Sequence, residues 1–175
     1  MKRFTDAGRM AIKEGNLYAA LCIALTIPDI CASLEYPAEK SKKRYEKWYK
    51  KWAESKFTSS SKIFVSAADC YQLRCSIIHS GTPEIAADKR DVLSRFVFFD
   101  QTAGAHLTWS EANSVDGVKQ ASFLQLKADL FSEAIFRAAD EWDAATINDA
   151  NVQKEKAKLF LVHTKGDTIG GIKFG

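Results

Sequence analysis

The chain has 175 residues, of which 46% are hydrophobic and 27% charged, and its formal net charge is +3. These values are ordinary for a globular protein and differ from those of a disordered chain, so we expect one domain with a core of its own. The longest apolar stretch, residues 17–27, is too short to span a bilayer, and Asp6 and Glu14 before it are unlike the start of a signal peptide. We therefore expect a cytoplasmic protein without membrane contact.

The first third of the sequence predicts two helices. Residues 1–15 form a short polar helix, and Asn16 is a suitable N-cap for an apolar helix that follows. Pro28 is expected to kink or restart this second helix, which continues to about Leu34, and Pro37 ends it.

The next predicted helix, residues 39–54, is both aromatic and basic. Its aromatic side chains recur at the spacing of one helix face: Tyr45, Trp48, Tyr49 and Trp52. Residues 40–56 hold eight basic and two acidic residues, whereas the rest of the chain has a net charge of −3. The Ser/Thr-rich residues 56–62 predict a loop.

A further helix begins after Ser66, a suitable N-cap, and ends at Gly81, with Pro83 preventing its continuation. Two apolar segments, 96–99 and 106–109, flank the turn-like residues 101–104 and predict a small β-hairpin.

The remaining sequence predicts a long amphipathic helix over about 117–142 and a shorter one over about 145–158. The tail alternates weakly and is expected to form a second hairpin turning near residues 166–167. We thus expect a mostly α fold, a bundle of four or five helices with a small β-hairpin insertion. The predicted organisation is a single domain over 1–175, with a helical core at about 4–82 and 117–158 and the β insertion at about 94–110.

The cysteines give no sign of a metal site. Cys22, Cys31, Cys70 and Cys75 include no CxxC pair, and no histidine lies at a zinc-site spacing from them. Buried free thiols in a reducing compartment are the favoured interpretation, and disulfides are the alternative. We expect no metal and no cofactor.

One short stretch carries a candidate catalytic pair. Arg74 is followed by four residues and then His79, near the end of the helix that begins after Ser66. This arrangement resembles the HEPN superfamily, as do the segments Tyr18–Cys31, Lys42–Trp48 and Asp69–Gly81. The resemblance covers residues 16–81. Cys75 departs from the polar residue that often follows the arginine in the HEPN motif.

The resemblance implies a helical bundle, and in many members a metal-independent ribonuclease that acts as a dimer. Other members are inactive modules that bind a nucleotide, RNA or a partner protein. The chemistry suits the two side chains. Imidazole, with an unperturbed pKa of about 6.5, can serve as base or acid when a 2′-hydroxyl attacks its own phosphate. A guanidinium can stabilise the charge that develops on the phosphate oxygens.

One chain supplies one such histidine, so a two-fold dimer is needed to bring together a base and an acid. Geometry is an obstacle, because five residues separate two side chains by roughly 140° around an ideal helix. Either the length of the arginine or unwinding of the helix near residues 80–81 must overcome this separation. Asp69 and Tyr71 are possible supporting residues.

A structural interpretation of the pair stays open. In that interpretation Arg74 pairs with Asp69 or with another acidic residue, and His79 caps the C-terminal end of its helix, where a cation is favourable. His106 and His163 have no partner pattern, and we expect them to be strand residues and not ligands.

The basic helix also has two interpretations. Lys42, Lys43, Arg44 and Lys47 are candidate RNA-binding residues, because lysines beside aromatic rings can contact phosphates while the rings stack on bases. The favoured alternative for the aromatics is a place in the core. The lysines then form a solvated face, or pair with the acidic residues 140–143.

Three functions follow. The first is a dimeric endoribonuclease, with a setting in phage defence or as a toxin implied only by the resemblance, and with RNA and an antitoxin or regulatory protein as possible partners. The second is a non-catalytic HEPN-like module. The third is a structural helical protein without a role in nucleic-acid chemistry.

Overall fold

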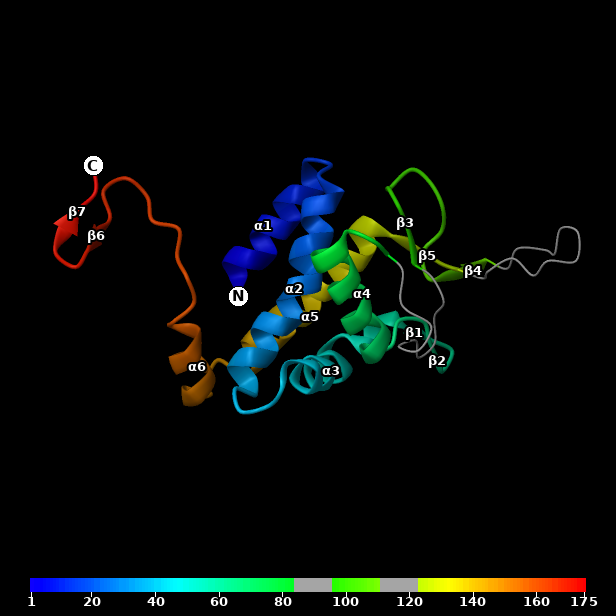
Figure 1. The fold of residues 1–175 in the computed structure, drawn as a ribbon, viewed down its shortest axis with the longest axis horizontal. Helices are drawn as coiled ribbons and strands as arrows, with labels where there is room; N and C mark the ends of the chain where they lie inside the picture. Colours follow the sequence, from blue (N-terminus) through cyan, green and yellow to red (C-terminus); the bar gives the residue numbers. More distant parts are fainter. Residues whose placement is uncertain (84–95, 111–122) are drawn as a thin grey trace, which may run out of the picture.

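The fold is mostly α-helical, as predicted. The computed structural model describes residues 1–83, 96–110 and 123–175 (Figure 1). Its helices are α1 (Lys2–Lys13), α2 (Leu17–Glu35), α3 (Ser41–Trp52), α4 (Ala67–Ser80), α5 (Ala128–Ala145), α6 (Ala150–Lys156) and the 3₁₀ turn η1 (Glu54–Phe57). Its strands are β1 (Thr58–Ser59), β2 (Lys62–Ile63), β3 (Phe96–Phe99), β4 (Thr108–Ser110), β5 (Phe123–Lys127), β6 (Thr168–Ile169) and β7 (Ile172–Lys173).

The central helix of the bundle is α2. It packs most extensively on α5 and also contacts α1, α3, α4 and α6 (Figure 1). By length and composition α2 is apolar enough to cross a membrane, but half of its most apolar window is buried inside the protein, and core helices of soluble proteins pass the same test. The helix runs unbroken through Pro28, so the predicted restart at that residue is wrong.

The predicted helix ends are confirmed at three positions. The side chain of Asn16 accepts a hydrogen bond from the Ala19 amide, and that of Ser66 accepts one from the Asp69 amide. Gly81 ends α4 in the left-handed conformation at φ 67°. A residue with a Cβ adopts this conformation at a cost, which is why glycine suits the position.

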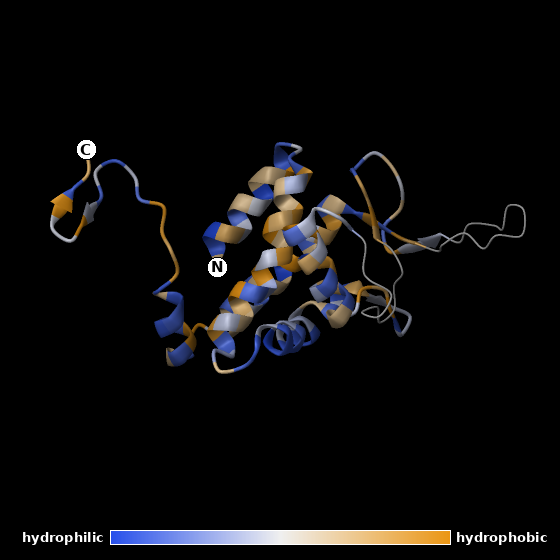
Figure 2. Ribbon diagram, in the orientation of Figure 1, coloured by the Kyte–Doolittle hydropathy of each residue, from blue (hydrophilic) through white to orange (hydrophobic). Residues whose placement is uncertain are grey.

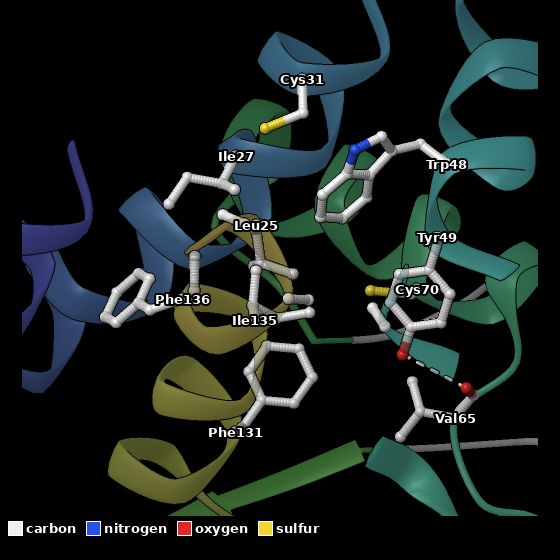
Figure 3. Close-up of a cluster of buried hydrophobic side chains, with 14 of the residues drawn as sticks. Leu25, Ile27, Cys31, Trp48, Tyr49, Val65, Cys70, Phe131, Ile135 and Phe136 are labelled. Atoms are coloured by element: carbon white, nitrogen blue, oxygen red, sulfur yellow. Dashed lines mark hydrogen bonds between the residues drawn. The ribbon is translucent and has the colours of Figure 1, made fainter. Parts of the chain in front are cut away.

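The core lies where α2, α3, α4 and α5 meet, and Figure 3 shows part of it. Tyr45, Trp48 and Tyr49 of α3 are fully buried there, so the prediction that the aromatic face belongs to the core is confirmed. The Tyr49 hydroxyl donates a hydrogen bond to the Val65 carbonyl at 3.2 Å, which satisfies its one polar group (Figure 3).

The predicted β-hairpin is wrong in its pairing. Strands form at β3 and β4, but β5 lies between them in the order β3-β5-β4, parallel to β3 and antiparallel to β4. The sequence pattern predicts helix for residues 123–127. They alternate instead between buried Leu124 and Leu126 and half-buried neighbours, a period of two, and α5 begins only at Ala128. The expected helix start at 117 lies outside the described residues.

Two turns differ in detail from the prediction. The expected loop 56–62 contains a small antiparallel hairpin of β1 and β2. The predicted C-terminal hairpin exists, but β6 and β7 are joined by Gly170 and Gly171 and not at residues 166–167. Both glycines have positive φ, 58° and 85°, as a two-residue hairpin loop of type I′ requires.

Candidate active site

The candidate pair lies in the C-terminal half of α4. Arg74 is half-buried, and His79 is exposed in the last turn before Gly81. The two side chains meet, with Arg74 Nη1 3.3 Å from His79 Nε2. The helix remains intact through Ser80, so the contact does not depend on unwinding. Side chains of a helix lean toward its N-terminus, which tilts His79 toward Arg74, and the length of the arginine covers the remaining distance.

This contact defines the hydrogen-bonding role of the imidazole. A guanidinium has only donors, so in a hydrogen bond with Arg74 the acceptor is His79 Nε2. The lone pair that would take a proton from a substrate is therefore held by Arg74.

Arg74 has a second partner that joins α4 to α2. Its Nη2 atom lies 2.6 Å from Asp29 Oδ2 in an ion pair in which both side chains are mostly buried. Burial alone would lower the pKa of Arg74, but the carboxylate of Asp29 and the Cys75 thiol raise it above its ordinary value. Asp29 Oδ1 also accepts a hydrogen bond of 3.3 Å from the Ser41 hydroxyl at the start of α3. Residues of α2, α3 and α4 thus meet at the carboxylate of Asp29.

Asp29 is a site residue that sequence reasoning missed. Its signal was its position, a single carboxylate between Pro28 and Ile30 within an otherwise apolar helix. A charge in such a place needs a partner. The open question of which acid pairs with Arg74 is answered by Asp29 and not by Asp69.

Of the two proposed supporting residues, Asp69 lies at the start of α4, and Tyr71 lies nearer the pair, beside Ser41, Cys75 and Asp29. Asp69 is buried in the first turn, where it is hydrogen-bonded to Ser66 at the N-cap. Tyr71 is half-buried and packs edge-on against Tyr45, with ring centroids 5.2 Å apart. Burial, and next the nearby Cys75, raise the pKa of Tyr71.

The candidate RNA-binding lysines are ion-paired on the surface of α3. Lys43 and Lys47 both contact Glu39, at 3.3 and 2.9 Å, and Lys42 lies 3.7 Å from Glu46. Arg44 is half-buried, and its Nε has no hydrogen-bond partner among the described residues. Of the lysines in the basic segment, Lys56 pairs with an acid of 140–143, Glu141, at 2.7 Å, whereas Lys42, Lys43 and Lys47 do not. Asp140 instead pairs with Arg9 of α1, and Asp143 with Lys156 of α6.

The other histidines and the cysteines lie away from the pair, apart from Cys75. Neither His106 nor His163 lies in a strand, contrary to expectation. His106 accepts a hydrogen bond from the Lys127 amide, and His163 Nδ1 lies 3.3 Å from Asp167 Oδ2 in the C-terminal tail. All four cysteines are free. Cys31 and Cys70 are buried as expected, and burial raises the pKa of Cys70 to about 12. Cys22 is exposed, contrary to expectation, and Cys75 is half-buried.

Nothing in the described part of the chain brings together three side chains of the types that bind metals. Comparison with known proteins gives no match, whether with family models, with curated proteins or with solved structures. Function is therefore inferred from the geometry around Arg74 and His79.

Proposed function

We propose that this protein is a HEPN-like endoribonuclease that cleaves RNA without a metal ion and acts as a homodimer in the cytoplasm. The observation that carries the proposal is the contact of 3.3 Å between Arg74 Nη1 and His79 Nε2 at the accessible end of α4. A cation and a proton-transfer group in contact are the two functions that cleavage by the 2′-hydroxyl requires.

In the proposed reaction the incoming phosphate draws Nη1 of Arg74 away from His79. The freed lone pair of Nε2 then takes the proton of the 2′-hydroxyl, whose oxygen attacks the phosphorus atom. The bond to the 5′-oxygen breaks, that oxygen receives a proton, and a 2′,3′-cyclic phosphate remains. Arg74 stabilises the charge on the phosphate oxygens while Nη2 stays anchored on Asp29.

The proton for the 5′-oxygen comes from His79 of a second copy, whose imidazole must enter the reaction protonated; after the step the first His79 carries a proton and the second is neutral. A two-fold axis beside the C-terminal half of α4 would place two such pairs at one cleft. Ile78, next to His79, is an exposed apolar side chain that such a contact would cover. The N-terminus of α3 lies beside Asp29, and the positive end of a helix dipole there favours a phosphate.

Cleavage of a fluorescent RNA in EDTA, with analysis of the product ends, tests the proposal. We expect 2′,3′-cyclic phosphate ends from the wild type and a loss of about 10²–10⁴-fold in rate for His79→Ala. His163→Ala is the matched control, since it removes an exposed histidine that lies 84 positions away in the chain and should cleave normally. Equal cleavage by His79→Ala and the wild type, or equal cutting of single-stranded DNA, contradicts the proposal.

A second candidate function is a non-catalytic HEPN-like module that binds nucleotide, RNA or a regulatory protein. It is favoured by the ion pair of Arg74 with Asp29, because in this pair the arginine joins α4 to α2 and has a structural role. If the wild type binds RNA without cleaving it, and Arg74→Ala abolishes that binding, this second function is the correct one.

A further inference from the structure

The end of the chain leaves the body of the protein. We call residues 158–175 the C-terminal arm; in Figure 1 it extends from α6 to the β6–β7 hairpin, away from the bundle. Phe160 is 68% exposed and Val162 84% exposed, and the hairpin exposes further apolar side chains. Figure 2 shows the apolar character of the segment that follows α6 and of β7. Phe160 keeps one ring contact with the body, edge-on to Phe4 at 5.7 Å.

The body carries an apolar pocket of about 440 Å³, which we call the β3 pocket. It lies between the N-terminal part of α2, the C-terminal end of α4, and β3. Its lining includes Leu17, Tyr18, Cys22, Ile77, Val97 and Phe99. Tyr18 is 87% exposed, so the rim of the pocket presents a large aromatic side chain to solvent.

The backbone of the arm is complementary to the edge of β3, and the apolar side chains of the arm are complementary to the pocket beside that strand. Within the described residues β3 pairs only with β5, and it is an outer strand of its sheet. Residues 160–164 of the arm are extended and pair with no strand of the described structure (Figure 1). An extended apolar segment that adds to a free strand edge gains backbone hydrogen bonds and places alternate side chains in the adjoining pocket. Phe160 and Val162 alternate in this way.

We propose that the C-terminal arm of one copy docks along β3 and into the β3 pocket of a second copy, and that the exchange is reciprocal. The arm lies at one end of the long axis of the molecule and the three-stranded sheet toward the other, which favours a second copy over the same chain (Figure 1). The arm also carries three lysines and one aspartate, and Asp100 lies on the pocket wall.

A reciprocal exchange involves two arms and two pockets. Phe160 and Phe174 are 68% and 49% exposed, so two arms supply four phenylalanines with surface left to bury, in addition to their aliphatic side chains. Specific interfaces typically bury about 1,200–2,000 Å² in total, so both arms and both pockets must take part.

A native thiol makes the test direct, because Cys22 is exposed on the pocket wall. Val162→Cys places a second thiol on the arm. Under mild oxidation of mixed ¹⁴N and ¹⁵N protein we expect a disulfide between Cys22 and the thiol introduced at position 162, joining light and heavy chains in mass spectrometry. Two controls should not give this link. The first is Val162→Cys combined with Cys22→Ser, and the second is Ser59→Cys, on the exposed β1 strand, in place of Val162→Cys. A disulfide within one chain only, or none, overturns the proposal.

The dissociation constant of the dimer gives an independent measurement that does not depend on nuclease activity. Val162→Asp should raise this constant by about tenfold or more, because it places a charge in an apolar interface. His163→Asp, the same charge on a neighbouring exposed position that strand alternation turns away from the pocket, is the control and should have a much smaller effect. Both side chains are exposed in the monomer, so neither variant should unfold it. An equal effect of the two variants, or a wild type that stays monomeric at high concentration, overturns the docking. A failed nuclease assay leaves it unaffected.

Discussion

Helix α3 and the C-terminal end of α4 both carry residues suited to RNA, but the protein presents them in opposite ways. The aromatic rings of α3 face inward and are buried, and its lysines at 42, 43, 47 and 51 are paired with glutamates. The end of α4 leaves His79 and Ile78 exposed, with Arg74 fixed directly beneath them. Whether such residues are available to a ligand therefore depends on the helix face on which they lie, and the residue types alone do not show it.

The difference also shows how a charge count along the chain misleads. The basic segment 40–56 has a net charge of +6, but two of the acids that neutralise it, Glu35 and Glu39, precede the segment. Charge neutralisation depends on neighbours in space. The electrostatic potential around α3 is therefore less positive than the charge of the segment alone suggests.

Trp48→Ala should produce the largest loss of stability. Trp48 is 0% exposed, and removing a buried tryptophan side chain costs about 3–5 kcal/mol of unfolding free energy. Urea denaturation followed by circular dichroism measures it. Tyr18→Ala removes a ring that is 87% exposed and should change the unfolding free energy little. Equal losses of unfolding free energy in the two variants would contradict the distinction between a buried and an exposed aromatic residue.

Asp29→Asn should have the next largest effect. It leaves the mostly buried guanidinium of Arg74 without its carboxylate, which costs about 1–3 kcal/mol. His79→Ala removes an exposed side chain and should cost no more than about 0.5 kcal/mol. Thermal melts of both variants therefore separate the structural half of the site from the exposed half. A larger loss for His79→Ala than for Asp29→Asn contradicts this division.

Glu35→Gln tests the acids that hold α3 in place. Burial alone would raise the pKa of Glu35, but hydrogen bonds from Tyr36, Lys51 and Trp142 outweigh it and lower the pKa. The stability from Glu35 is thus present above about pH 4.3, the value for a glutamate in an unfolded chain, and is lost as the pH falls through the lower folded value.

We expect Glu35→Gln to lose on the order of 1 kcal/mol at pH 7 and to flatten the acid side of the stability curve. Glu14→Gln, at an exposed glutamate, is the control, and urea denaturation between pH 3 and pH 7 is the measurement. An acid limb of unchanged steepness in Glu35→Gln would show that this carboxylate is not the group that titrates.

The helices were predictable because local rules set their ends. Asn16, Ser66 and Gly81 act at the termini within a few residues of themselves, and the aromatic spacing of α3 identified its buried face. The sheet was not predictable in the same way. Residues 123–127 fit a helical and a strand pattern alike, and the placement of β5 between β3 and β4 depends on contacts far along the chain. Asp29 was missed for a similar reason, since its partner lies 45 positions away.

The smallest effect is expected from the lysines of α3. Changing Lys42, Lys43 and Lys47 together to Gln removes three exposed ion pairs, each worth about 0–1 kcal/mol, and should lower the unfolding free energy only slightly. If these lysines also contact phosphates, the dependence of RNA affinity on salt should weaken by a slope of about two, since each contact to a single strand contributes about 0.7. We expect a smaller change, because Glu39 and Glu46 already occupy their ammonium groups.

Lys40 and Lys50 have no ion pair among the described residues, so Lys40→Gln with Lys50→Gln is the matched comparison. Fluorescence anisotropy at several salt concentrations measures both sets. If the triple variant loses the full slope and the double variant none, then α3 is an RNA-binding surface after all, and the contrast with the end of α4 must be abandoned.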